Sequence, residues 1–165
     1  MEEQYKYNDY VEAVKQYLQQ YNDFKTYIEN VKADIEDIKA QLRLEAAPKT
    51  TKFTGMPGGG DSSQQEMSLQ RAEFLNKELD RLNRELIRLE PLVKRIDRSL
   101  NRLDKNDEML MNSKWICNCS WESTAEIVSA SVGYCRNQNE RVLKKLARMI
   151  FGPRADSKQA IVLFR

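Results

Sequence analysis

Two long runs of apolar residues, spaced at alternating three- and four-residue steps, constrain this chain more than any other feature of its sequence. Such steps place the apolar side chains in one seam along a helix, with charged and amide side chains between them. A repeat of about 3.5 residues per turn, sustained over this length, favours helices that supercoil around a partner. The seam positions are Tyr10, Val14, Tyr17, Tyr21, Phe24, Ile28, Val31, Ile35, Ile38 and Leu42 in the first run, and Leu75, Leu79, Leu82, Leu86, Leu89, Val93, Ile96, Leu100 and Leu103 in the second.

The stretch between the two runs, from Ala46 to Gln65, contains two prolines and the run Gly58-Gly59-Gly60. This composition predicts a mobile linker without helix. Because such a linker can lead the chain back, an antiparallel hairpin within one chain is the favoured pairing, and parallel self-association is the alternative. Pro91 interrupts the second run on its outer face, which predicts a kink or a break between two coaxial helices.

The segment from Ser120 to Ile150 predicts two short helices separated by a tight turn. Ser120 can cap the first helix, with Glu122 in the first turn, and Ser131 can cap the second. The outline is that of a helix-turn-helix. The expected apolar positions are Trp121, Thr124 or Ala125, and Val128 in the first helix, and Cys135, Val142, Leu146 and Met149 or Ile150 in the second.

These patterns predict an all-α protein, in which two long heptad helices form a coiled-coil hairpin and a helix-turn-helix follows at the C-terminal end. The predicted segments are a heptad helix over 1–46, a Gly/Pro-rich linker over 47–66, a second heptad helix over 67–105, the helix-turn-helix over 106–152 and a tail over 153–165.

Charge is distributed unevenly along the chain, although its net value is only +2. Residues 1–47 carry six Lys/Arg and ten Asp/Glu, whereas residues 109–165 carry nine Lys/Arg and four Asp/Glu. A basic C-terminal part indicates a polyanionic partner. Double-stranded DNA is therefore the expected ligand of the second helix of the pair.

Exposed positions at the start of a recognition helix meet base edges in the major groove, and basic positions farther along meet phosphates. Arg136 can form two hydrogen bonds with guanine and Asn137 two with adenine, while Glu140 could accept from cytosine. The same face could instead be a solvated basic helix surface. The predicted DNA-binding residues are Ser131, Val132, Gly133, Arg136, Asn137, Glu140, Arg141, Lys144 and Lys145.

No other chemistry is indicated by the residue types. The chain has three cysteines and no histidine, so Cys117 and Cys119 lack the partners of a four-ligand zinc site and are expected to be small buried thiols. No nucleophile motif or inward carboxylate pair suggests an enzyme, and no cofactor or metal is expected. No apolar run approaches the roughly 18–20 residues of a membrane span. The odd cysteine count and the lack of a signal peptide favour the cytoplasm.

Two stretches, Thr54–Gly60 between the heptad runs and the helix pair from Ser120 to Leu146, resemble the ArpU/RinA-like phage late-gene transcriptional regulators. Thr54-Gly55-Met56-Pro57-Gly58-Gly59-Gly60 is similar to the Gly-Met-Pro-rich signature between that family's helices. Ser120-Trp121-Glu122, Ser131-Val132-Gly133-Tyr134-Cys135 and the run from Arg141 to Leu146 resemble its C-terminal helix-turn-helix, a module similar to region 4 of sigma factors. The order of segments also matches the family's.

The resemblance implies a phage or prophage activator of late genes, acting in the cytoplasm of a bacterial host. Thr124 and Gln138 stand where the family usually has apolar residues, so looser packing of the helix pair or weaker DNA binding is expected. Two other functions stay open: a coiled-coil structural or adaptor protein with a basic protein-binding end, and a sigma-like subunit that contacts host RNA polymerase together with DNA.

A homodimer is also expected, because one short basic helix makes few phosphate contacts and two copies can read two half-sites. The heptad seams could pair two chains, although the two seams of one chain could instead bury each other.

Overall fold

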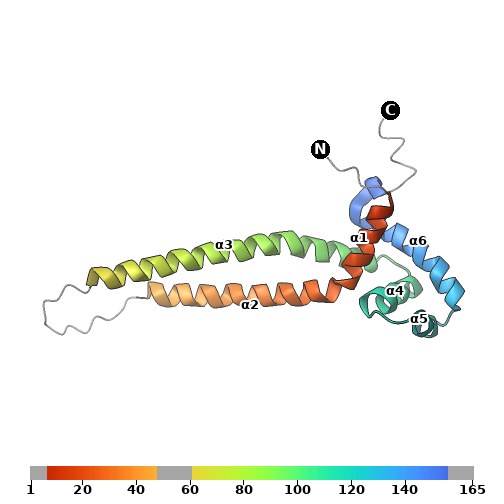
Figure 1. The fold of residues 1–165 in the computed structure, drawn as a ribbon, viewed down its shortest axis with the longest axis horizontal. Helices are drawn as coiled ribbons and strands as arrows, with labels where there is room; N and C mark the ends of the chain where they lie inside the picture. The colour runs from red at the N-terminus through yellow and green to blue at the C-terminus, as the bar shows by residue number, and fades with distance from the viewer. Residues whose placement is uncertain (1–6, 48–60, 156–165) are drawn as a thin grey trace, which may run out of the picture. The chain divides into compact units, whose positions relative to one another are not determined.

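The structure is a computed structural model that describes residues 7–47 and 61–155, and every regular element in these ranges is helical (Figure 1). The all-α prediction is therefore confirmed for the part of the chain that the structure describes. The elements are α1 (Tyr7–Gln19), α2 (Tyr21–Ala46), α3 (Asp61–Leu100), α4 (Lys105–Met111), a π-helical turn η1 (Asn112–Ile116), α5 (Trp121–Val128), α6 (Val132–Phe151) and a 3₁₀ turn η2 (Gly152–Ala155).

The helices belong to two compact units. We call residues 26–47 and 61–90 the middle unit, and residues 7–25 and 91–155 the terminal unit.

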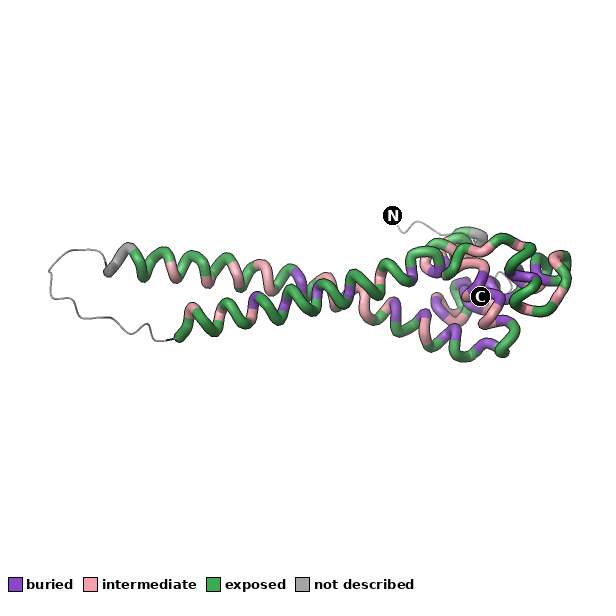
Figure 2. Tube along the Cα trace, turned by 90° about the horizontal axis from the view of Figure 1, so that it is seen from below, coloured by how far each residue is buried: buried purple, intermediate pink, exposed green. Residues whose placement is uncertain are grey.

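The middle unit is held together by the apolar seam between α2 and α3. Val31, Ile35, Ile38 and Leu82 are buried, and they form one cluster with further leucines that are partly buried (Figure 2). The partly buried members are Leu42, Leu75, Leu79 and Leu86. All eight are positions of the predicted heptad runs, so these runs correctly identify the buried face of both helices in this unit.

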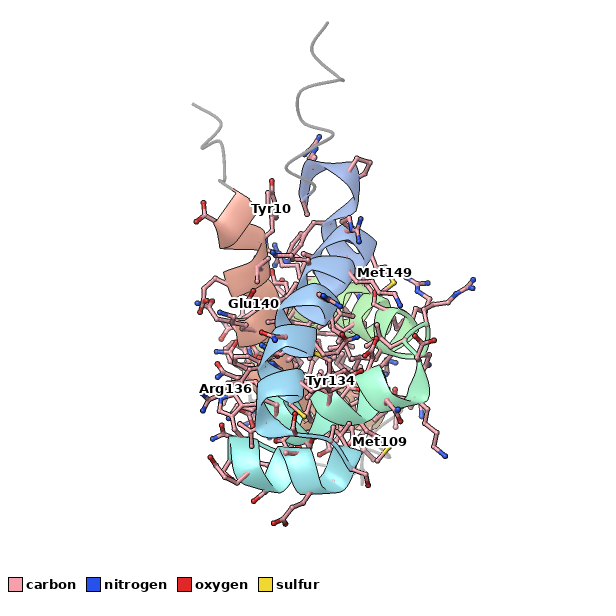
Figure 3. All side chains as sticks on the ribbon, turned by 90° about the vertical axis from the view of Figure 1, so that its right-hand side faces the viewer. Tyr10, Met109, Tyr134, Arg136, Glu140 and Met149 are labelled. Carbon is pink, nitrogen blue, oxygen red and sulfur yellow. The ribbon has the colours of Figure 1, made fainter. Side chains whose placement is uncertain are left out.

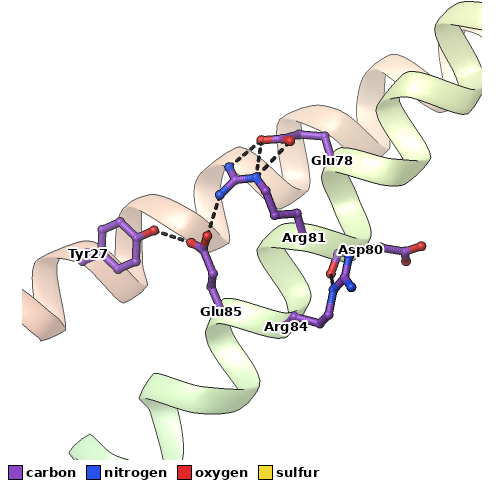
Figure 4. Close-up of polar contacts among 6 residues, drawn as sticks. All are labelled: Tyr27, Glu78, Asp80, Arg81, Arg84 and Glu85. Carbon is purple, nitrogen blue, oxygen red and sulfur yellow. Dashed lines mark hydrogen bonds and ion pairs between the residues drawn. The ribbon is translucent and has the colours of Figure 1, made fainter.

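Polar pairs at the edges of the seam fix the relative direction of the two helices. Glu45 near the end of α2 accepts a hydrogen bond of 2.9 Å from Ser68 near the start of α3. At the other end, the Tyr27 hydroxyl of α2 donates to the Glu85 carboxylate of α3 (Figure 4). Later residues of α2 thus pair with earlier residues of α3, and the helices run antiparallel.

Glu85, which accepts from Tyr27, also belongs to a charged cluster on α3. The Arg81 guanidinium bonds to both the Glu78 and the Glu85 carboxylates, three residues before it and four after it (Figure 4). Arg81 lowers the pKa of Glu78 below its ordinary 4.5. Because water reaches all three side chains and screens their charges, these ion pairs contribute little to stability.

The predicted first heptad helix is divided in the structure, since α1 ends at Gln19 and α2 begins at Tyr21. In α1 the fully buried side chains are Val14 and Leu18, and Leu18 is not a heptad position. The heptad position Tyr17 is only half-buried and its ring lies 6.0 Å from that of Phe151. The division follows from packing: α1 contacts α6, η1 and η2 in the terminal unit, so its buried face differs from that of α2.

The boundaries of α3 also differ from the prediction. The helix begins at Asp61, so the end of the stretch that was predicted to lack helix is helical. Residues 48–60, including the glycine run and most of the predicted mobile linker, lie outside the described residues. No break occurs at Pro91, because Asp61–Leu100 is one helix. The proline ring is exposed, as its position on the outer face predicted. Water can therefore reach the backbone carbonyl group that has no N–H donor at Pro91.

The core of the terminal unit brings together α1, the end of α3, α4 and α6. Ile96, Leu110 and Met111 are almost fully buried, as are Leu143 and Leu146 of α6. The predicted tail contributes Ala155, which is fully buried at the end of η2. Residues 156–165 lie outside the described residues.

Tyr21 joins the start of α2 to α3 within the terminal unit. Its side chain is buried, and its hydroxyl donates a hydrogen bond to the Asp97 carboxylate. The Lys25 ammonium lies 3.8 Å from the same carboxylate and 4.6 Å from the centre of the tyrosine ring. Burial and the hydrogen bond to Asp97 raise the pKa of Tyr21 above its ordinary value of 10.0, and Lys25 opposes part of this rise.

This raised pKa makes stability depend on pH in the alkaline range. A group whose pKa is raised by folding contributes stability that is fully present below its unfolded pKa and is lost as pH rises through the folded pKa. The Tyr21→Phe variant cannot ionise at this position. The free energy of unfolding, measured in urea, should therefore differ between the two proteins by a constant amount from about pH 7 to 9 and by less above pH 10. A difference that stays constant to about pH 11.5 would contradict this coupling.

Candidate nucleic-acid interface

Three serines set the two ends of α5 and the start of α6. Ser120 caps α5 by accepting a 3.1 Å hydrogen bond from the Ser123 backbone N–H. Ser131 caps α6 by accepting a 3.2 Å hydrogen bond from the Tyr134 backbone N–H. Both predicted caps are confirmed. Ser129 ends α5 in the left-handed region, with φ of 56°.

The chain leaves α5 through a Schellman motif. The Ser129 N–H bonds to the Glu126 carbonyl at 3.1 Å, and the Ala130 N–H bonds to the Ala125 carbonyl at 2.9 Å. Because Ser129 has a side chain, its left-handed conformation costs on the order of 1 kcal/mol of folding free energy relative to glycine. These bonds and the cap that follows fix where α6 starts relative to α5.

One face of α6 is buried and sets which residues face outward. Cys135, Val142, Leu146 and Ile150 are buried as predicted, and α1, α4, α5 and η2 all contact the helix. Asn139, Leu143 and Ala147 complete the buried face.

The opposite face of α6 carries Asn137, Arg141, Lys144 and Arg148, which we call the outer stripe. Their spacing of four, three and four residues places them in one line along the helix, and all four are exposed. Three are cations and one is an amide.

The other predicted contact residues surround this stripe. Ser131, Gly133, Arg136 and Glu140 are exposed, whereas Val132 and Lys145 are half-buried. A Cβ added at Gly133 would meet no atom within 4 Å. The structure therefore brings the predicted residues onto one helix, but not onto one face.

Arg136 lies on the flank of α6 rather than on the outer stripe. Its guanidinium carbon is 5.9 Å from the centre of the Trp121 ring of α5, and the Lys114 ammonium lies 4.9 Å from the same ring. Figure 3 shows Arg136 and Glu140 to one side of α6 and Tyr134 between them and Met109. Contacts of a cation with an aromatic face stabilise by about 0.5–1 kcal/mol at exposed sites, so they favour one orientation of the Arg136 side chain.

A groove of about 470 Å³ runs beside this flank, within the terminal unit. Trp115 and Trp121 line it, together with Lys15 of α1 and with Glu140 and Lys144 of α6. The Lys15 ammonium lies 5.8 Å from the Trp115 ring centre. Cations and the Glu140 carboxylate line this groove together, so it attracts a phosphate less strongly than the outer stripe does.

Thr124 and Gln138, which stand where apolar residues were expected, are both hydrogen-bonded. Thr124 is fully buried and its hydroxyl donates to the Ser120 carbonyl at 2.8 Å. The Gln138 amide donates to the buried Asp107 carboxylate of α4 at 2.9 Å. The polar group of Thr124 is therefore satisfied inside the unit, and looser packing or weaker DNA binding stays a prediction.

Sequence reasoning missed two features of this surface. Tyr134, in the first turn of α6, is 53% exposed and adds a large aromatic ring beside the outer stripe. Asn139 is 7% exposed, and its side-chain oxygen accepts a 2.7 Å hydrogen bond from the Trp115 indole N–H. The spacing of apolar residues gives no reason to place Asn139 on the buried face of α6. The one signal in the sequence is Trp115, because a buried indole N–H needs a hydrogen-bond acceptor.

The thiols are placed differently from one another. Cys135 is buried as expected, but Cys117 is exposed and Cys119 half-buried, so the expectation of buried thiols is wrong for Cys117.

Among the described residues, no group of three or more cysteine, aspartate or glutamate side chains could hold a metal ion. No helix in the described ranges is long and apolar enough to cross a membrane.

No protein family, curated protein or solved structure significantly matches this chain.

The Trp115–Asn139 hydrogen bond gives a test of how α6 is held. Asn139→Ala leaves the indole N–H without its acceptor and should lower the free energy of unfolding by about 1–3 kcal/mol. Asn137→Ala makes the same substitution on the exposed face and should stay within about 0.5 kcal/mol of the wild type. Urea unfolding followed by circular dichroism measures both, and equal losses would show that the buried hydrogen bond does not hold α6.

Proposed function

We propose that this protein binds double-stranded DNA through α6 and acts as a transcriptional activator. The outer stripe is the observation that carries this proposal. A helix buried on one side and lined with cations and an amide on the other has the shape and charge to enter a major groove.

The polarity of the stripe supports two separate tasks. Asn137 lies near the start of α6, beside Tyr134, where a recognition helix reaches base edges, and its amide can pair with adenine N6 and N7. Arg141, Lys144 and Arg148 follow along the helix and are suited to phosphate contacts, which give affinity without sequence preference. Arg136 keeps its proposed contact with guanine, reached from the flank beside Trp121.

The finer parts of the proposal rest on the sequence. The α5–α6 pair is a helix-turn-helix of the sigma region 4 kind, and the antiparallel pair α2–α3 is a coiled-coil hairpin. Activation of phage or prophage late genes in a bacterial cytoplasm, with host RNA polymerase as a further partner, follows from the family resemblance.

Salt dependence of DNA binding provides the test. Each phosphate contact contributes about 0.9 to the slope of log affinity against log salt concentration on duplex DNA. Arg141→Ala with Lys144→Ala should therefore reduce the slope by about 2 on any DNA sequence. We choose Arg141 rather than Lys145 because Lys145 is half-buried.

A matched control removes the same charge elsewhere. Lys77→Ala with Arg84→Ala deletes two exposed cations of α3, in the middle unit, and should leave affinity and slope unchanged. Gel shifts on the DNA flanking the protein's own gene and on random DNA provide both readouts. If both double variants lose affinity equally, the protein responds to net charge and α6 is not the contact helix.

The alternative function, a coiled-coil structural or adaptor protein, has one observation in its favour. Several large apolar side chains of the middle unit are exposed, among them Leu44, Phe74 and Ile87. Absence of salt-dependent DNA binding by the wild type would favour this alternative over the activator.

A further inference from the structure

An apolar groove opens on the middle unit, near the residues that flank the connection between α2 and α3. Leu44 of α2 and Met67, Phe74 and Leu75 of α3 line a space of about 500 Å³. Leu44 is 73% exposed, Phe74 69% and Met67 53%. Isolated apolar side chains on a surface are ordinary, but three that meet in one groove indicate a contact surface.

The seam beside this groove is incompletely covered. Ile35, Ile38 and Leu82 are buried, whereas Leu75, which belongs to the same seam and also lines the groove, is only partly buried. Two helices can cover each other along one line only. A further pair of helices laid against this side would bury the rest of Leu75, as in a four-helix bundle.

The charges at the groove indicate what such a partner must carry. Glu45 and Arg71 both line it, with 4.0 Å between their charged groups. A rim with one charge of each sign gives no attraction for a polyanion such as DNA. A two-fold axis brings the same patch of two copies together, so Glu45 of one copy can face Arg71 of the other.

We propose that this groove binds a second copy of the chain, with Phe74 of each copy inserted between Leu44 and Met67 of the other. The three exposed side chains offer on the order of 100 Å² each, so two copies together bury about 600 Å² of apolar surface. The polar rims bring the contact toward the ~1,000 Å² that a specific interface needs. The inference goes beyond DNA binding, since the groove lies in the middle unit and α6 in the terminal unit.

Sedimentation equilibrium of the full chain at micromolar concentration, without DNA, tests the proposal. The wild type should have the mass of a dimer. Phe74→Glu and Leu44→Lys, each at an exposed position where folding tolerates a charge, should each raise the dissociation constant at least 30-fold. Mixing the two variants should restore a dimer, because Phe74 of one copy still meets Leu44 of the other in one contact, and Glu meets Lys in the second.

Leu69→Glu and Ile87→Glu are the matched controls. Both positions lie on α3 and are 62% and 72% exposed, yet helical geometry places each about 140° around the helix from Phe74. Both controls should remain dimers. A monomeric wild type at tens of micromolar would overturn the proposal and leave the groove to a different protein, and so would controls that dissociate as readily as the groove variants. Gel shifts on the same samples keep this outcome separate from the DNA-binding result.

Discussion

The burial of one face of α6 is the constraint on which the candidate interface depends. Val142, Leu143 and Leu146 are at most 1% exposed, and the contacts around them come from α1, α4 and α5. Complete burial of such side chains is worth roughly 1.5–3 kcal/mol each, so α6 cannot rotate without losing a large share of the unit's stability. Because the buried face is fixed, the outer stripe is fixed on the opposite side. The polar group inside this face is paired as well, since Asn139 accepts from the Trp115 indole.

The two units use apolar surface in different ways. The terminal unit surrounds α6 with several short helices and buries its core from many sides. The middle unit has only α2 and α3, so its seam is buried at Ile35 and Ile38 and is only partly covered at Leu75. The same physical limit, that two helices cover each other along a single line, explains both the heptad spacing of the middle unit and the apolar groove that a second copy would fill.

Sequence spacing predicted the helical class, the seam of the middle unit, the serine caps of α5 and α6, and most of the buried face of α6. It failed where two apolar residues are adjacent: Tyr17 and Leu18 both fit a helical spacing, but Leu18 is fully buried and Tyr17 only half-buried. It could not locate the start of α3, because Asp61-Ser62-Ser63 has no apolar residue to set a period. The position of Arg136 over Trp121 depends on how α5 packs on α6, which no local pattern shows.

The proposed function depends on contact between the outer stripe of α6 and DNA. Amide chemical-shift changes in the isotopically labelled full chain, on titration with a short duplex at low salt, test it most directly. We expect the largest changes at Asn137, Arg141 and Lys144, and small ones at Arg81 and Arg84 of the middle unit. Changes concentrated in the middle unit, or spread equally over the cations of both units, would contradict it.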